Sequence, residues 1–246
     1  MSSVTQIDEY SLAAKPLEMR FRGTPLAQGT GFIWRVNGRA FLVTCWHNVT
    51  GKNPTTGKHL SCHAGEPDEV MIQLDLAGSS PGTRRAVKLP LLNADGVPLW
   101  LEHPLMPAVD VVALPLPEMP GTVLNPINEM PSNPASPPIG YDAFILGYPF
   151  GIGVSTLPIW KRASVASEPS IPINGQPCFY VDTASRPGMS GSPVILRHRY
   201  AIGPSTTFVG VYSGRVGADD ELQAQLGIVW RAEVIDQIVN GGRRLR

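Results

Sequence analysis

Residues 186–193 read Arg-Pro-Gly-Met-Ser-Gly-Ser-Pro and place Ser190 directly before one glycine and two residues after another. A serine hydroxyl is a weak nucleophile at neutral pH, so catalysis needs an exposed serine on a tight turn, a nearby base and amide donors for a developing oxyanion. The glycines permit such a turn, and Gly188, which lacks a Cβ, can direct its amide toward the same point as the Ser190 amide. The stretch predicts a nucleophile turn. An ordinary Gly/Ser/Pro turn is the alternative when it is read alone.

A general base for Ser190 must come from one of the five histidines. His47 stands out because it closes the apolar run 42–49, which we expect to be a strand that fixes its backbone. Read alone, a histidine that merely ends a strand would be the better interpretation. The other candidates are His59, His63, His103 and His198.

Asp110 opens the apolar run Asp-Val-Val-Ala-Leu at residues 110–114. A carboxylate at the mouth of a buried strand is costly to desolvate unless a partner such as an imidazole N–H compensates it. We therefore expect Asp110, rather than Asp95, to be the acid that pairs with the histidine. A solvated aspartate at a strand end is the alternative.

The composition favours an all-β chain. Glycine and proline each occur 25 times in 246 residues, while 43% of the residues are apolar and 16% are charged. These values argue against disorder, coiled coils and helical bundles, and they favour many short strands joined by turns. Residues 29–49 predict a hairpin, because Asn37-Gly38 readily supplies the positive φ angles of a type I′ turn. Further strands are expected at 70–76, 109–116, 141–148, 178–182, 193–197 and 208–212.

Residues 115–138 contain eight prolines and divide the chain into two lobes. Proline lacks the amide donor that a central strand needs, so this segment predicts an extended connector. Apolar residues at 234, 235, 238 and 239 predict a closing amphipathic helix. The expected organisation is an N-terminal extension (1–20), a first β-barrel lobe (21–116), the connector (117–139), a second β-barrel lobe with the terminal helix (140–240) and a basic tail (241–246).

Charge and cysteine usage constrain the partners and the compartment. Twenty basic residues balance twenty acidic ones, so no global field attracts nucleic acid or anionic lipid. Three cysteines, Cys45, Cys62 and Cys178, cannot all pair with one another, which fits a reducing compartment. We expect Cys45 to face the core. The start of the chain lacks the pattern of a secretory signal and no apolar run is long enough to cross a bilayer, so we expect a cytoplasmic protein.

Five segments in one order resemble the chymotrypsin-like (trypsin-fold) serine proteases. They are Thr-Cys-Trp-His at 44–47, Asp-Val-Val-Ala-Leu at 110–114, Gly-Met-Ser-Gly-Ser-Pro at 188–193, Val-Gly-Val-Tyr-Ser-Gly at 209–214 and Gly-Ile-Val-Trp at 227–230. Residues 181–191 are most similar to the bacterial HtrA/Deg and glutamyl-endopeptidase branches. We expect no PDZ domain, because only one helix and a short tail follow residue 230. The resemblance implies an all-β fold of two six-stranded antiparallel β-barrels, with the active site in the cleft between them.

The resemblance also implies a serine endopeptidase that forms an acyl-enzyme intermediate, needs no cofactor or metal, and acts on protein or peptide substrates. Ser190 would be the nucleophile, His47 the general base and Asp110 the residue that orients the imidazole. The amides of Gly188 and Ser190 would form the oxyanion hole. The strand at 213–215 would pair with the substrate main chain.

The substrate-binding residues implied by the resemblance are Ala184, Ser185, Tyr212, Ser213, Gly214, Arg215 and Gly227. Ala184 occupies the pocket floor, so the buried acid that selects lysine or arginine is missing, and a cationic side chain there would be desolvated without a counter-ion. We expect an aliphatic preference. Arg215, if it points inward, would favour glutamate or aspartate instead.

Met189 departs from the zymogen-type proteases, which carry an aspartate there that pairs with a new N-terminal amine. A methionine cannot make this ion pair, so we do not expect classical zymogen activation. Narrow specificity, or an activating partner that orders the loop 186–189, is the expected means of control.

Three other interpretations compete with a serine endopeptidase. The first is a metal site formed by His59, Cys62 and His63, with Asp68 nearby. The spacing of these residues matches no standard zinc motif. An α/β-hydrolase would need a glycine at Ser192 and a histidine far behind the serine, whereas only His198 follows. A catalytically silent protease fold that serves as a binding or scaffold module remains the alternative of a different class.

Overall fold

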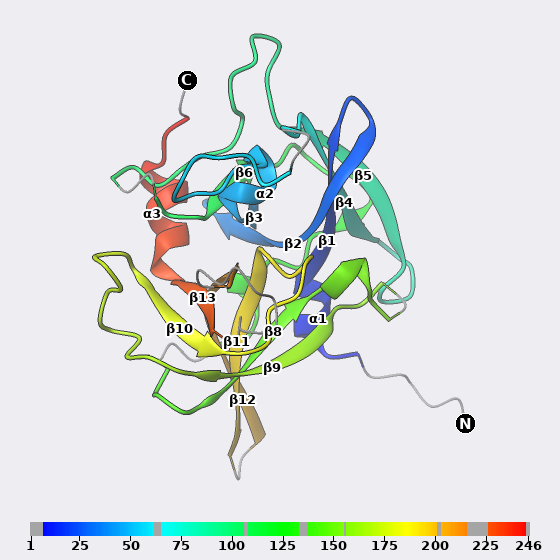
Figure 1. Cartoon of the computed structure of the whole chain (residues 1–246). Coiled ribbons are helices and arrows are strands. Elements are labelled where there is room, and N and C mark those ends of the chain that lie inside the picture. Colours follow the sequence, from blue (N-terminus) through cyan, green and yellow to red (C-terminus); the bar gives the residue numbers. More distant parts are fainter. Residues whose placement is uncertain are drawn as a thin grey trace.

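The computed structural model describes residues 7–61, 65–105, 108–132, 137–154, 156–200, 203–215 and 226–244. Two β lobes lie one above the other in Figure 1, with the last helix along one side. The first lobe and the connector hold α1 (Glu9–Ala13), β1 (Ala14–Phe21), β2 (Thr24–Val36), β3 (Arg39–Thr44), α2 (Trp46–Thr50), β4 (Glu69–Leu76), β5 (Arg84–Pro90), β6 (Val112–Pro115), β7 (Thr122–Val123) and the 3₁₀ turn η1 (Ile127–Glu129).

The second lobe is a closed antiparallel barrel with the strand order β10-β13-β12-β11-β8-β9. Its elements are β8 (Asp142–Gly147), the 3₁₀ turn η2 (Pro149–Gly151), β9 (Ile159–Val165), β10 (Cys178–Asp182), β11 (Ser192–Tyr200), β12 (Gly203–Arg215) and β13 (Leu226–Arg231), followed by α3 (Glu233–Gly241). Inward-facing apolar side chains such as Ile145, Phe179 and Val194 fill the barrel. The sequence did not single out β9, where charged residues interrupt the apolar pattern.

The first lobe is a sheet in the order β5-β4-β1-β2-β3-β6, with the short β7 paired to β4. The expected hairpin is confirmed: β2 and β3 pair antiparallel across Asn37 and Gly38, which have φ values of 50° and 75°. The all-β fold with a terminal helix is likewise confirmed. The first lobe was expected to be a closed barrel of six strands; among the described residues it is a sheet of seven strands, because β7 pairs with β4, and its path runs from β5 to β6.

Three details of the expected organisation are wrong. The first sheet begins at Ala14, inside the expected N-terminal extension, because β1 pairs with both β2 and β4. The strand before His47 ends at Thr44, and His47 lies on α2 instead. The connector contributes β7, and Ile127 within it is fully buried in the core. A buried lysine at position 15 obscured β1 in the sequence, because charge at an inward position breaks the apolar alternation.

A core between the lobes fixes one against the other. Phe32 and Val111 of the first lobe pack in the same cluster as Ile195 and Val211 of the second. The predicted closing helix is confirmed as α3, whose Val234, Ile235 and Ile238 are buried in this cluster. The basic tail contacts the first lobe, since Arg243 and Glu102 exchange backbone hydrogen bonds of 2.9 and 3.2 Å.

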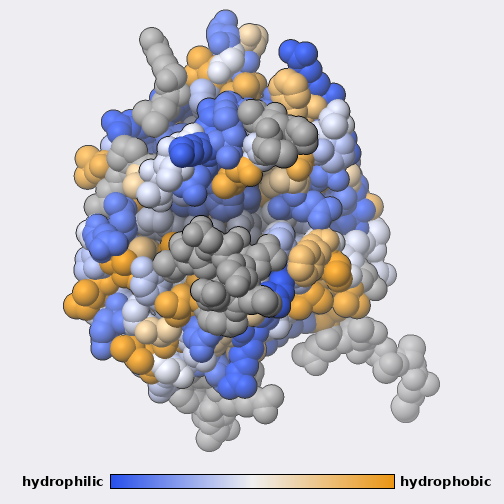
Figure 2. Space-filling view, viewed as in Figure 1, coloured by the Kyte–Doolittle hydropathy of each residue, from blue (hydrophilic) through white to orange (hydrophobic). Residues whose placement is uncertain are grey.

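Hydrophobic residues are interspersed with hydrophilic ones over the face shown in Figure 2. Within the described ranges, no helix combines the length and the apolar character needed to cross a membrane.

Candidate active site

His47 and Asp110 form a tightly paired unit in the first lobe. His47 lies in the first turn of α2, and Asp110 lies just before β6 with 1% of its surface exposed. Asp110 Oδ1 accepts the His47 backbone amide at 2.9 Å, and Oδ2 lies 2.6 Å from His47 Nδ1. The carboxylate thus fixes both the backbone and the ring of the histidine, which leaves Nε2 as the nitrogen available to a substrate or nucleophile.

Burial of the His47 ring by itself lowers the pKa of the imidazole. The negative charge of Asp110 and its hydrogen bond outweigh this effect, so the pKa of His47 is raised above 6.5. A raised pKa favours the imidazolium that forms when the histidine takes a proton.

Ser213 completes the environment of the acid from the second lobe. Its Oγ donates to Asp110 Oδ2 at 2.5 Å. Gly214 follows it at a bulge of β12, and a Cβ built on Gly214 would lie 3.7 Å from Ser190 Oγ. Ser190 therefore lies near Gly214, and the adjacent Ser213 binds Asp110. These contacts place His47, Asp110 and Ser190 together between the lobes.

The Ser190 turn is held by contacts from both lobes. The Ser190 carbonyl accepts the Thr30 amide at 2.9 Å and Asn48 Nδ2 at 3.0 Å. The next amide, that of Gly191, donates to Tyr212 O at 2.8 Å. Gly191 has a φ of 87°, and a Cβ there would lie 2.0 Å from Thr30 O, so only glycine fits.

The Gly188 amide is oriented by the peptide bond before it. Pro187 O accepts the Phe150 amide at 2.7 Å. In a trans peptide the C=O and N–H point in opposite directions, so the Gly188 N–H is directed away from Phe150. Among the described residues, neither the Gly188 nor the Ser190 amide donates to a protein acceptor. Both amides are therefore free to bind an oxyanion.

The side chain of Met189 contributes apolar packing. Its side chain is 1% exposed and lies in the core of the second barrel. The polar contact at this place comes from the neighbouring residue, since the Gly188 carbonyl accepts a hydrogen bond from Thr30 Oγ1 at 2.8 Å.

The structure places several of the expected specificity residues in the second lobe. Ala184 and Ser185 lie half-buried in the segment between β10 and the Ser190 turn. Tyr212 is 1% exposed, and a Cβ built on Gly227 would lie 2.4 Å from Tyr212 Cε2. The Tyr212 ring thus packs directly on Gly227. The side chain of Arg215 lies outside the described residues.

Cys45, His47 and Asp110 place potential metal-ligand atoms within 4.8 Å of one another. The chemistry is unfavourable, because burial, followed by the charge of Asp110, raises the pKa of the Cys45 thiol well above 9.0. The thiol donates instead to Tyr212 O at 3.4 Å, and Cys45 is buried as expected. Of the residues around His59 that match no standard zinc spacing, residues 62 and 63 lie outside the described residues.

Sequence reasoning missed Thr30, Asn48 and Phe150, which hold the Ser190 turn. One signal was present in the Gly-Thr-Gly stretch at 29–31. A Cβ on Gly29 would lie 2.7 Å from Asn48 Nδ2, and one on Gly31 would lie 2.7 Å from Leu42 Cδ1. Glycines inside a strand mark such close approaches.

Comparison with known proteins bears on the family and the fold of the chain. A family model described as a trypsin-like peptidase domain matches residues 29–203. The active form of the Rv3671c protease from M. tuberculosis is 20% identical with a TM-score of 0.53, covering 96% of this chain and 83% of that one.

Two further solved structures have TM-scores of 0.55. A serine endoprotease from Yersinia pestis is 12% identical, with 96% of this chain and 66% of that chain covered. A thermostable serine protease from an extremophilic microorganism is 14% identical, with 95% and 97% covered. At these identities the likeness establishes the fold. A search of curated proteins finds no significant match.

Proposed function

The chain belongs to the trypsin-like peptidase family, and from this premise we propose that it hydrolyses peptide bonds through Ser190, His47 and Asp110. The observation that carries the proposal is the buried Asp110 carboxylate, which accepts hydrogen bonds from the His47 backbone, the His47 ring and Ser213. A buried carboxylate that orients a histidine is the arrangement found in the Ser-His-Asp triad.

The reaction proceeds in two acyl-transfer steps. His47 Nε2 takes the Ser190 hydroxyl proton as the oxygen attacks the scissile carbonyl, and the imidazolium then protonates the leaving amine. Asp110 holds the tautomer with a proton on Nδ1 and stabilises the imidazolium. The amides of Gly188 and Ser190 donate to the oxyanion. Water, deprotonated by the same histidine, then hydrolyses the acyl-enzyme.

The substrate is an extended stretch of a protein or peptide that adds as a strand along Ser213 and Gly214. The packing of Tyr212 on Gly227 supports a small pocket for the residue before the scissile bond. Ala184 provides no counter-ion for a cation. We therefore favour small aliphatic residues at this position. An Arg215 side chain directed into the pocket would instead give a preference for glutamate or aspartate.

For the cellular role, we propose an enzyme of a reducing, cytoplasmic compartment that is controlled by narrow specificity or by an activating partner. The free thiols of Cys45 and Cys178 support the compartment. The apolar surroundings of Met189 support control without an ion pair at this position. Vigorous casein hydrolysis by the purified protein alone would contradict this form of control.

Labelling with a fluorophosphonate tests the catalytic assignment, since the reagent reacts only with an activated serine. The parent protein should be labelled and should cleave peptides, and Ser190→Ala should lose both properties while remaining folded. Ser192→Ala is the matched control: its hydroxyl is buried and meets no partner among the described residues, so labelling should persist. A folded parent protein that is not labelled would favour the silent scaffold instead.

A further inference from the structure

A cluster of charged side chains is buried at the edge of the first lobe. The side chains of Lys15 and Arg84 are both 0% exposed, and that of Asp75 is 8% exposed. Lys15 Nζ pairs with Asp75 Oδ2 and also donates to Leu12 O at 2.7 Å. Arg84 Nε donates to Asp75 Oδ1 at 2.9 Å. Burying such charges is costly unless each is paired with good geometry, so the cluster constrains three strands at once.

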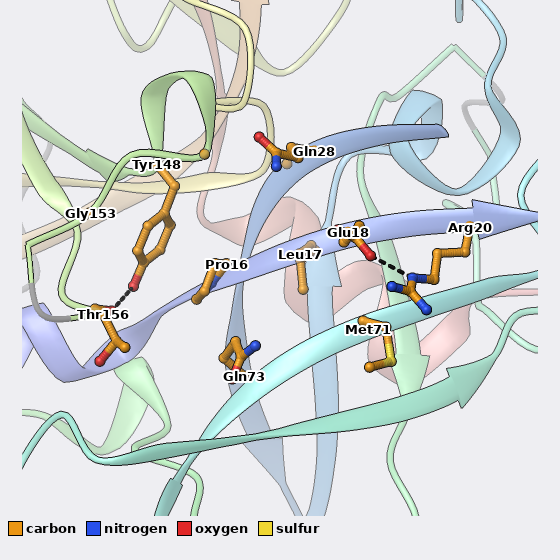
Figure 3. A pocket seen from close by; sticks show the side chains of 12 residues that line it. Pro16, Leu17, Glu18, Arg20, Gln28, Met71, Gln73, Tyr148, Gly153 and Thr156 are labelled. Carbon is orange, nitrogen blue, oxygen red and sulfur yellow. Dashed lines mark hydrogen bonds and ion pairs between the residues drawn. The ribbon is translucent and has the colours of Figure 1, made fainter. Parts of the chain in front are cut away.

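Tyr148 of the second lobe is attached to this cluster. Arg84 Nη1 donates to the Tyr148 hydroxyl at 2.7 Å and to Thr156 O at 2.8 Å. The hydroxyl lies 2.9 Å from Thr156 O and 3.2 Å from Ala14 O, both of which can accept its proton. Figure 3 shows the Tyr148 side chain directed from the segment after β8 toward Thr156.

The backbone around Tyr148 contacts the oxyanion turn directly. The Tyr148 amide donates to Thr30 Oγ1 at 3.2 Å, and that hydroxyl donates to Gly188 O at 2.8 Å. Two residues later, the Phe150 amide holds Pro187 O at 2.7 Å. The φ of Phe150 is 54°, a left-handed conformation that is costly for a bulky side chain. The surrounding contacts must therefore hold the 148–151 turn in place.

We propose that Tyr148, anchored by Lys15, Asp75 and Arg84, is a positioning residue that keeps the Gly188 amide pointed at the oxyanion. The assignment rests on the proposed function of Ser190. Tyr148 does not touch the reacting atoms and acts through Phe150 and Pro187. A buried charged cluster in the first lobe thereby sets the geometry of a donor in the second lobe.

A groove of about 480 Å³ adjoins this connection and is lined in part by Gln28, Tyr148, Gly151 and Thr156 (Figure 3). Tyr148 therefore lines the groove and is bonded to Arg84 of the charged cluster. The hydrogen bonds of Arg84 to the Tyr148 hydroxyl and to Thr156 O connect the two lobes at this edge.

Tyr148→Phe tests the positioning role, because it removes the hydroxyl and keeps the ring. Loss of a whole oxyanion donor costs ~10²–10³ in turnover, so a displaced donor should lower kcat by about tenfold. KM should stay unchanged, since the oxyanion forms only in the transition state. Affinity for a peptide boronate, which places a tetrahedral oxygen in the hole, should fall by the same factor as kcat. Asp75→Asn weakens the contact that holds Arg84, so it should also lower kcat and boronate affinity without changing KM. This variant provides the test if Tyr148→Phe does not fold.

Tyr10→Phe is the matched control. Tyr10 is also fully buried, and its hydroxyl donates to a backbone carbonyl, Pro131 O, at 2.6 Å. It should lose stability without losing kcat or boronate affinity.

Two outcomes would overturn the positioning role, and they are distinguishable. If the parent protein is active and labelled at Ser190 but Tyr148→Phe retains full kcat and boronate affinity, Tyr148 is merely structural and the proposed function stands. If the folded parent is neither labelled nor active, the proposed function fails and the positioning role fails with it.

Discussion

Gly188→Ala offers the sharpest test of the oxyanion hole. Gly188 has a φ of 90°, and a Cβ there would lie 2.4 Å from Tyr148 O, 3.2 Å from Phe150 N and 3.3 Å from Gly151 N. All three neighbours are backbone atoms, so no side chain can rotate away. The substitution must shift either the Gly188 peptide or the 148–151 turn.

The size of the effect follows from these distances. An ordinary contact begins near 3.4 Å, so the 2.4 Å approach requires a displacement of about 1 Å. A misplacement of ~1 Å in a catalytic group can cost ~10²-fold in rate, or about 2.7 kcal/mol of transition-state stabilisation. The left-handed backbone adds ~1–2 kcal/mol of lost stability for a residue with a Cβ. Catalysis and stability should therefore both decrease.

Gly140→Ala separates these two costs. Gly140 has a φ of 77° with nothing within 4 Å of a built Cβ, so the substitution carries the backbone strain without the clash. Steady-state cleavage of a peptide substrate and thermal unfolding should be measured for both variants. Gly140→Ala should lose stability and retain kcat, whereas Gly188→Ala should lose about 10²-fold in kcat. A folded Gly188→Ala with parental kcat would falsify the placement of the oxyanion hole.

Two further predictions concern the acid and the specificity pocket. In the parent protein kcat/KM should fall as the pH drops through a His47 pKa above 6.5, because the protonated base cannot accept the Ser190 proton. Asp110→Asn should lower kcat by ~10⁴ and move this acid limb to lower pH, since burial alone then acts on the imidazole; a pH–rate profile with the limb unmoved would contradict the pairing. Profiling with a peptide library should enrich small aliphatic residues before the scissile bond, whereas enrichment of lysine or arginine would refute a pocket with Ala184 at its floor. Enrichment of glutamate that disappears in Arg215→Ala would establish the acidic alternative.

Local signals in the sequence were sufficient for the elements whose cause is local. Asn37-Gly38 predicted the first hairpin because its positive φ angles are a property of those two residues. The spacing of Val234, Ile235 and Ile238 predicted α3 because its buried face follows the helical period. The glycines around Ser190 similarly indicated a tight turn, and both adopt positive φ.

Long-range partners could not be read from the sequence. Lys15 lies within the range 1–20 that was expected to be an N-terminal extension, although its side chain is buried. Its burial depends on Asp75, sixty residues away, which no local pattern connects to it. The turn at 148–151 was missed for the same reason. It contacts Pro187, which is distant in the sequence, and no local pattern in either segment predicts this contact.

Thr30 joins the two lobes at the proposed catalytic site. It is fully buried on β2 of the first lobe, and its amide and hydroxyl donate to the carbonyls of Ser190 and Gly188 in the second. Its own carbonyl accepts Thr44 Oγ1 at 2.8 Å, at the end of the strand that leads into α2 and His47. One buried residue thus ties the backbone of Ser190 and Gly188, the proposed nucleophile and oxyanion donor, to the strand before His47, the proposed base. Any sliding of one lobe against the other would break these hydrogen bonds together and leave buried polar groups unpaired. The register between the lobes is therefore a requirement of the catalytic geometry as well as of the fold.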